Sequence, residues 1–276
     1  MTARKEEAFT TTDGIRIAFR SWRPEGTARG IVVIVPGFNS HSGYYGWVAE
    51  QLNRDALLVF AIDLRGRGRS EGERFTVTSF ADYAGDVAQL IALAKAHVPG
   101  LPLFLLGHSA GGVVAGLYAI DRQDELRGLI IESFAFELPA PDFALAIIKG
   151  VSHVAPHAHV LRLKNEDFSR DPAIVAAMNS DPLIADEAQP AETLAALVRA
   201  DQQLRQGFSR LVLPLLILHG TEDKAARPNG SQHFYEAAGA ADKTLKLYAG
   251  RFHDPLNDVG RDEVIADISN WIDLHL

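Results

Sequence analysis

The sequence predicts an α/β fold, with a mostly parallel central sheet, helices on both faces and one helical insertion. Short apolar runs alternate with segments of helical periodicity along most of the 276 residues. One such run, residues 103–106, leads through the sharp turn Gly107-His108-Ser109-Ala110-Gly111 into a helical pattern over 110–120. Strands that alternate with helices build a parallel sheet, because each helix carries the chain back across one face.

The elements follow in order from an N-terminal hairpin. Asp13-Gly14 is a typical turn between strands at 8–11 and 15–22. Ser79 is the expected N-cap of the helix over 82–96. Further strands are predicted at 30–35, 57–62, 129–131, 213–219 and 244–248. Further helices are predicted near 44–53, between the last two strands, and over 262–274.

Composition and charge exclude several classes of protein. The formal net charge of −8 provides no basic surface, so we expect no nucleic-acid partner. The absence of cysteine excludes disulfides, thiolate metal sites and cysteine nucleophiles. Residues 1–7 lack the apolar region of a signal peptide, and no apolar run approaches the length of a membrane span. We therefore expect a cytoplasmic protein that needs no cofactor.

Ser109 is the candidate nucleophile. The glycines of G-x-S-x-G allow a tight turn that projects the serine hydroxyl. A serine needs a base and an acid, which should lie at the carboxyl ends of other strands. Among ten histidines, His253 alone lies between the final strand and the final helix. Asp223, after strand 213–219, is the candidate acid, and Glu132, after strand 129–131, is the alternative. The order Ser…Asp…His favours Asp223.

Two backbone amides are candidates for an oxyanion hole. Ala110 begins the helix after the nucleophile, where amides are free and the helix dipole is favourable. Phe38 lies in the loop Pro36-Gly37-Phe38-Asn39-Ser40 after strand 30–35, although these residues also suit a plain turn.

Other histidines are not expected to hold a metal. His153, His157 and His159 cluster, but Pro156 interrupts their spacing and no acidic ligand lies among them. His108 is expected to pack or hydrogen-bond beside the nucleophile, and His219 is placed to line the site.

Residues 136–208 break the alternation of strands and helices. Their apolar positions follow helical spacing over 143–149 and 193–206, without a convincing strand. The segment is too long for a loop, so we expect a first core segment (1–135), a helical cap (136–208) and a second core segment (209–276). The cap either packs on the core or forms an apolar acyl-binding channel above Ser109. Its candidate apolar residues are Phe143, Leu145, Ile147, Ile148, Val151 and Val154.

Taken together, these motifs resemble the monoacylglycerol lipases of the lysophospholipase-like α/β-hydrolase group over nearly the whole chain. The resemblance implies an α/β-hydrolase fold, a Ser109–His253–Asp223 triad, and oxyanion amides at Phe38 and Ala110. It also implies a serine hydrolase that forms an acyl-enzyme from a small-molecule ester, above all a monoacylglycerol or similar medium-chain lipid ester. The family's amphipathic cap can rest on membranes, which makes peripheral membrane contact an expectation here. The motifs are 107–112 (GHSAGG), 63–74 (DLRGRGRSEGER), 179–183 (NSDPL), 216–223 (LILHGTED), Gly230-Ser231 and 243–253 (KTLKLYAGRFH).

The chain departs from the family at two places. Pro36-Gly37-Phe38-Asn39 replaces His-Gly-x-Gly, and Ala110 replaces a methionine. Both keep the backbone donors but alter the pocket, so an esterase for a small or aromatic ester remains an alternative. An acyltransferase or a carbon–carbon bond hydrolase would use the same triad. Dehalogenases and epoxide hydrolases of this fold need an aspartate at Ser109, and a binding protein would be expected to lack a triad member. The oligomeric state is left open.

Overall fold

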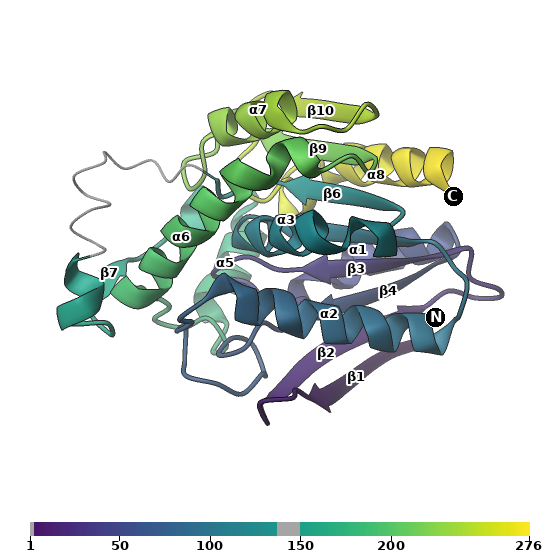
Figure 1. Ribbon diagram of the computed structural model, residues 1–276. Helices are drawn as coiled ribbons and strands as arrows, with labels where there is room; N and C mark the ends of the chain where they lie inside the picture. The colour runs from purple at the N-terminus through teal and green to yellow at the C-terminus, as the bar shows by residue number, and fades with distance from the viewer. Residues whose placement is uncertain (1–2, 137–149) are drawn as a thin grey trace.

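The computed structural model describes residues 3–136 and 150–276, and its centre is an eight-stranded sheet between two layers of helices (Figure 1). The strand order is β1-β2-β4-β3-β5-β6-β9-β10. β1 and β4 pair antiparallel with β2, and the remaining pairs are parallel. The predicted α/β architecture is confirmed. The strands are β1 (Ala3–Thr10), β2 (Arg16–Arg23), β3 (Gly30–Val35), β4 (Leu57–Ile62), β5 (Leu103–His108), β6 (Gly128–Glu132), β9 (Leu215–Gly220) and β10 (Lys243–Tyr248).

The predicted hairpin joins β1 and β2. Gly14 has a φ of 86°, which suits the tight turn, and the Ile15 amide donates to Thr11 Oγ1 at 2.9 Å. The expected N-cap of helix α2 (Phe80–His97) is also present, because Ser79 Oγ accepts from the Ala81 amide at 3.2 Å. Local sequence therefore determines the start of both elements.

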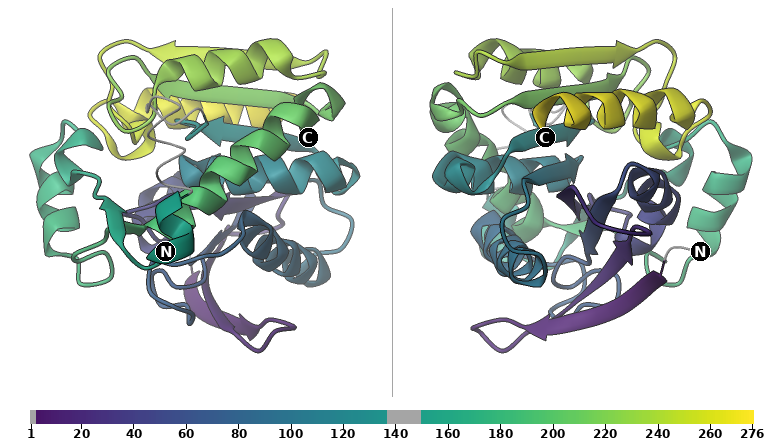
Figure 2. Two further views of the ribbon diagram at one scale, coloured as in Figure 1. Left: turned by 60° about the vertical axis from the view of Figure 1, so that its left-hand side comes forward. Right: turned by 90° about the vertical axis from the view of Figure 1, so that its right-hand side faces the viewer.

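Helices cover both faces of the sheet, as the turned views show (Figure 2). α2 (Phe80–His97), α3 (Ala110–Arg122), α6 (Ala191–Gly207) and α7 (Pro228–Ala237) lie on one face. α1 (Gly46–Arg54), preceded by the 3₁₀ turn η1 (Ser42–Tyr45), and α8 (Arg261–His275) lie on the other. β3 is apolar throughout because it is buried on both sides: Val33 packs in the first core cluster and Val32 in the second.

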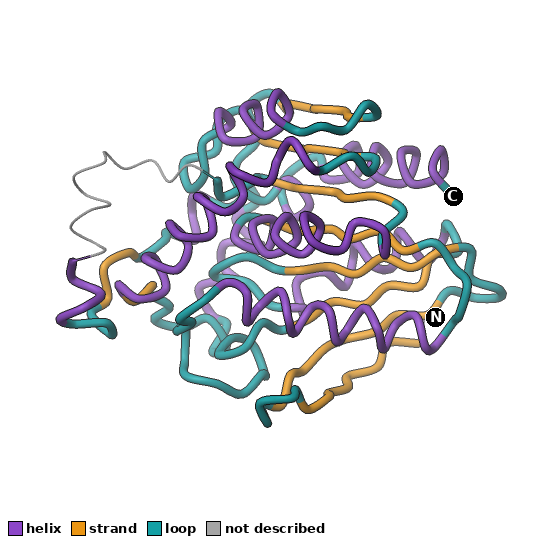
Figure 3. The backbone as a smooth tube through the Cα atoms, viewed as in Figure 1, coloured by secondary structure: helices purple, strands orange, loops and turns teal. Residues whose placement is uncertain are grey.

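The described part of the predicted insertion, residues 150–208, is more mixed than the sequence indicates (Figure 3). It contains α5 (Pro172–Ser180) and α6, but also a short antiparallel pair, β7 (His159–Leu161) with β8 (Gln189–Pro190). The expectation of a strand-free insertion was wrong. These strands are too short to leave a periodic pattern in the sequence. The predicted helix over 143–149 lies outside the described residues.

Part of this segment packs on the core. α6 buries Leu194, Leu197 and Leu204 in the first core cluster, and a Cβ at Gly116 of α3 would lie 2.9 Å from Leu204 Cδ2. By contrast, Val154 is 88% exposed, so its expected packing role was wrong. Within the described parts of the chain, no helix is both long and apolar enough to cross a membrane.

Candidate active site

Ser109 lies on a strained turn between β5 and α3. Its φ of 55° is in the left-handed region, which is costly for a residue with a side chain. The two flanking glycines make this turn possible. A Cβ at Gly107 would lie 2.5 Å from the Gly111 carbonyl oxygen, and a Cβ at Gly111 would lie 2.0 Å from that of Val35. The G-x-S-x-G spacing therefore follows from how closely α3 approaches the sheet.

A continuous chain of hydrogen bonds joins the three candidate catalytic side chains. His253 Nε2 lies 2.8 Å from Ser109 Oγ, and His253 Nδ1 lies 2.7 Å from Asp223 Oδ2. Ser109, Asp223 and His253 follow β5, β9 and β10 respectively, and all three are buried. Because parallel strands end at the same edge of a sheet, side chains far apart in sequence meet there. The Phe168 ring meets the His253 ring edge-on, with 4.9 Å between centroids.

Asp223 is held as a carboxylate by four donors. Oδ2 accepts from His253 and from His219 Nε2 at 2.9 Å, while Oδ1 accepts from the Ala225 and Ala226 amides at 2.8 and 2.9 Å. Burial alone would raise the pKa of Asp223, but the adjacent His253 and His219 outweigh it and hold that pKa below its ordinary value. With Asp223 beside Nδ1, His253 Nε2 faces Ser109 Oγ.

His219 supports the acid, a role that the sequence does not reveal. Its Nδ1 lies 2.7 Å from Ser231 Oγ and its Nε2 faces Asp223. The sequence offers two signals of this role, the spacing of four residues between His219 and Asp223 and the Gly230-Ser231 motif. A Cβ at Gly230 would lie 2.3 Å from the Phe136 carbonyl oxygen, so this glycine allows α7 to approach closely.

Glu132, the alternative acid, is directed elsewhere. Its Oε1 accepts from the Leu256 amide at 2.9 Å. Among the described residues, Glu132, His108 and Asp254 are the candidate ligands for an ion, with ligand atoms within 4.8 Å of one another. Burial first, and then the charge of Asp254, raises the pKa of Glu132 well above its usual range. A proton on Glu132 is enough to reduce the charge of this cluster, so the cluster does not require a metal.

The other histidines lie apart from the proposed triad, except for His108. His108 Nε2 lies 3.2 Å from the His253 carbonyl oxygen, which supports the loop that carries His253. His157 Nδ1 pairs with Glu73 at 2.8 Å, and His159 begins β7.

The loop after β3 lies directly against the nucleophile. A Cβ at Gly37 would lie 2.7 Å from Ser109 Cβ. Phe38 follows, and its buried ring packs edge-on to Phe80 with 6.5 Å between centroids. Ala110 is the first residue of α3. Both candidate oxyanion residues are therefore next to Ser109 in space or in sequence.

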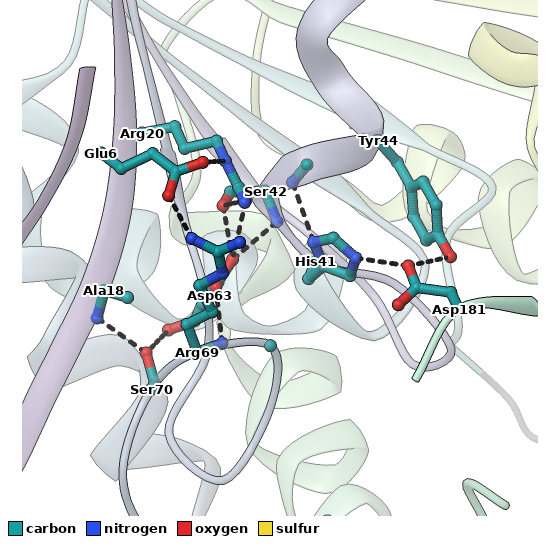
Figure 4. Close-up of polar contacts among 12 residues, drawn as sticks. Glu6, Ala18, Arg20, His41, Ser42, Tyr44, Asp63, Arg69, Ser70 and Asp181 are labelled. Atoms are coloured by element: carbon teal, nitrogen blue, oxygen red, sulfur yellow. Dashed lines mark hydrogen bonds and ion pairs between the residues drawn. The ribbon is translucent and has the colours of Figure 1, made fainter. Parts of the chain in front are cut away.

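The same loop continues into contacts with the segment 150–208. Figure 4 shows His41 between the Gly43 amide, which donates to Nδ1 at 3.0 Å, and Asp181, whose Oδ2 lies 2.8 Å from Nε2. Tyr44 also donates to Asp181 Oδ2 at 2.8 Å. Asp63, after β4, accepts from the Ser42 amide at 2.8 Å and so fixes the start of η1. Asp181 belongs to the NSDPL segment, 179–183.

A cavity of about 290 Å³ lies between this loop and the segment 150–208. Its lining includes Asn39 from the core, the apolar side chains of Met178 and Ile184, and Glu187. The other lining residues are mostly polar or charged, among them Arg162, Lys164 and Glu166, so the apolar side chains form the smaller part of the wall.

The chain is similar to known proteins over most of its length. Residues 26–260 match the family described as "Serine aminopeptidase, S33". The chain is 32% identical over 277 residues to the monoacylglycerol lipase of Mycolicibacterium smegmatis, covering 100% of this chain and 99% of that protein. It is 33% identical over 269 residues to the human monoglyceride lipase, covering 96% and 89%.

A solved structure is similar over the full length. The crystal structure of Paleococcus ferrophilus monoacylglycerol lipase superimposes with a TM-score of 0.81 at 29% identity, covering 100% of both chains. The chain therefore belongs to this serine hydrolase family of the α/β-hydrolase superfamily, and is a carboxylic ester hydrolase of its monoacylglycerol lipase-like group.

Proposed function

We propose that this chain hydrolyses monoacylglycerols or similar medium-chain lipid esters, with Ser109, His253 and Asp223 as its catalytic triad. The observation that carries the proposal is the buried hydrogen-bond chain from Ser109 Oγ through His253 to Asp223, with distances of 2.8 and 2.7 Å. A serine hydroxyl on a strained turn, beside an imidazole oriented by a carboxylate, suits acyl transfer.

In the proposed reaction, His253 Nε2 takes the proton of Ser109 as Oγ attacks the ester carbonyl. The tetrahedral intermediate collapses, the alcohol leaves with the proton from His253, and an acyl-enzyme remains on Ser109. Water, deprotonated by His253, then attacks the acyl-enzyme and releases the carboxylic acid. Asp223 stays ionised throughout and stabilises the imidazolium, which its lowered pKa supports.

The amides of Phe38 and Ala110 are the proposed donors to the oxyanion. The close packing of Gly37 on Ser109 supports the first, and the position of Ala110 at the start of α3 supports the second. Each donor of this kind lowers the barrier by roughly 2.7–4 kcal/mol. Preorganised amides are effective because they need no rearrangement when the charge develops.

The lipid part of the substrate rests on the relatives and on the cap. The Mycolicibacterium, human and Paleococcus proteins are named for monoacylglycerols or monoglycerides. We assign residues 136–208 as a cap over the site, between core segments 1–135 and 209–276. We include a peripheral contact with lipid surfaces in the proposal, for which Val154 and Val160 are exposed apolar side chains of this segment.

A panel of esters of increasing chain length tests this function. p-Nitrophenyl esters from acetate to decanoate, measured below their critical micelle concentrations, and matching monoacylglycerols are compared with a Ser109→Ala blank. Burial of one methylene is worth about 0.8 kcal/mol, so we expect kcat/KM to rise by up to roughly fourfold per carbon before the channel is full. A flat dependence would contradict a lipid channel and favour the alternative, a small or aromatic ester.

A further inference from the structure

A buried ion pair joins three parts of the chain beside the proposed oxyanion hole. Arg67, in the loop after β4, pairs with Glu187 of the cap, and both side chains are almost fully buried. Arg67 also donates to Gln189 Oε1 at 2.7 Å and to Tyr83 Oη at 3.3 Å. Its guanidinium carbon lies 4.2 Å from the centroid of the Phe38 ring. The pair therefore touches the side chain of a proposed oxyanion residue.

Glu187 reaches the backbone of the same loop. Its Oε1 accepts from the Asn39 amide at 2.9 Å and from Gln189 Nε2 at 2.8 Å, in addition to the pair with Arg67. A single carboxylate oxygen of the cap thus fixes the direction of the peptide plane between Phe38 and Asn39. The other oxygen, Oε2, has no hydrogen-bond partner among the residues that the structure describes.

Asn39 needs such support because of its backbone conformation. Its φ of 51° lies in the left-handed region, where the family pattern has a glycine and this chain has a side chain. The Asn39 side chain is held as well, since its Nδ2 donates to Asn165 Oδ1 of the cap at 3.0 Å. Phe38 is thus bounded by Arg67 and Phe80 at its ring and by Glu187 at the following amide, which limits rotation of its own N–H.

We propose that Glu187 and Arg67 are positioning residues that hold the Phe38 amide in the direction required to stabilise the oxyanion. The cap then contributes to the chemical step as well as to substrate binding, because Glu187 is a cap residue. This inference rests on the proposed function, since it assumes that Phe38 donates to the oxyanion. On this proposal, the function of the buried Arg67–Glu187 pair is to align the loop after β3 that carries Phe38.

Two conservative variants separate alignment from simple stabilisation. Glu187→Gln removes the charge but keeps Oε1 in place, because its amide nitrogen can occupy the unpartnered Oε2 position. Glu187→Asp keeps the charge for Arg67 but withdraws the oxygen from the Asn39 amide by one methylene. If Glu187 aligns the Phe38 amide, Glu187→Asp should damage catalysis more than Glu187→Gln does. A role in stability alone makes Glu187→Gln the worse change, because it leaves Arg67 buried without a counter-charge.

The test measures kcat and KM for p-nitrophenyl acetate, together with the inhibition constant of an alkyl boronic acid. The boronate forms a tetrahedral adduct on serine and places an oxygen where the oxyanion develops. Loss of a complete donor costs about 10²–10³-fold in kcat, so for Glu187→Asp we expect a fall of at least about tenfold. KM should stay within about threefold, and boronate inhibition should weaken by the same factor as kcat. Glu187→Gln, which keeps the acceptor for the Asn39 amide, should lose at least about threefold less kcat and boronate affinity than Glu187→Asp.

Asp86→Asn is the matched control. Asp86 is a buried carboxylate paired with Arg65 of the same loop, at 2.7 and 2.8 Å, and it touches neither Phe38 nor Asn39. Its variant should lose stability without losing kcat. The proposal is overturned if folded Glu187→Asp keeps wild-type kcat, or if Glu187→Gln weakens the boronate as much as Glu187→Asp. If Ser109→Ala retains full hydrolysis, the proposed function fails instead, whatever the Glu187 variants do.

Discussion

Replacement of Asp223 by asparagine should disable the proposed base while leaving the side-chain volume unchanged. Both Asp223 oxygens accept two N–H groups: Oδ2 from His253 and His219, and Oδ1 from the Ala225 and Ala226 amides. An asparagine must turn its NH₂ group toward one of these pairs of donors. If it faces His253, the ring relieves the clash by moving its proton to Nε2, and that N–H then points at Ser109 and cannot accept its proton.

The expected loss in kcat for p-nitrophenyl butyrate at neutral pH is roughly 10⁴-fold, or about 5 kcal/mol. Glu132→Gln is the matched control, since Gln can still accept from the Leu256 amide, and we expect kcat within about threefold. The reasoning is refuted if Asp223→Asn keeps a tenth of wild-type turnover, or if Glu132→Gln proves the more damaging substitution.

Three further predictions concern the turn, the buried acid and the cap. Gly111→Ala should lower the free energy of unfolding by about 1–3 kcal/mol in urea titrations, because its Cβ meets the Val35 carbonyl oxygen at 2.0 Å. Gly85→Ala in α2, which has open space around it, is the control and should be neutral or stabilising by up to about 1 kcal/mol. The raised pKa of Glu132 favours folding with Glu132 protonated, so its contribution is full below its unfolded pKa of about 4.3 and is lost as pH rises. The Tm advantage of Glu132→Gln should therefore grow from pH 4 to 8, and a constant difference would contradict this. Ile147 and Ile148 lie outside the described residues; polar substitutions there should reduce the preference for medium chains over acetate if these residues line the acyl channel, and an unchanged preference would exclude that role.

The fold and the order of the site residues could be predicted because local chemistry determines them. Gly107 of β5 is required by its contacts with α3, and Gly111 of α3 by its contacts with β3, and both mark the turn in the sequence. His253 and Asp223 could be found because a parallel sheet brings residues that follow its strands to one edge. For these two residues, knowing which strand each one follows is enough to predict that they lie close together.

The remaining features depend on contacts between distant segments. Arg67 and Glu187 are 120 positions apart, and nothing near either residue indicates the partner. β7 and β8 have three and two residues, too few for an alternating pattern. His219 ends a buried strand, where a histidine is also compatible with ordinary packing. Its contact with Asp223 could therefore be recognised only once β9 and α7 had been placed in space. Tertiary packing, rather than periodicity, determines each of these.

The most direct test of the account is covalent labelling of the nucleophile. A fluorophosphonate probe is incubated with the wild type and with Ser109→Ala, and the site of the adduct is located by peptide mass spectrometry alongside ester turnover. We expect one adduct on Ser109 in the wild type. In the Ser109→Ala variant, with unchanged circular dichroism and Tm, we expect no adduct and a loss of turnover of several orders of magnitude. Labelling at another residue, or turnover above a few per cent in the folded variant, would contradict the assignment of Ser109.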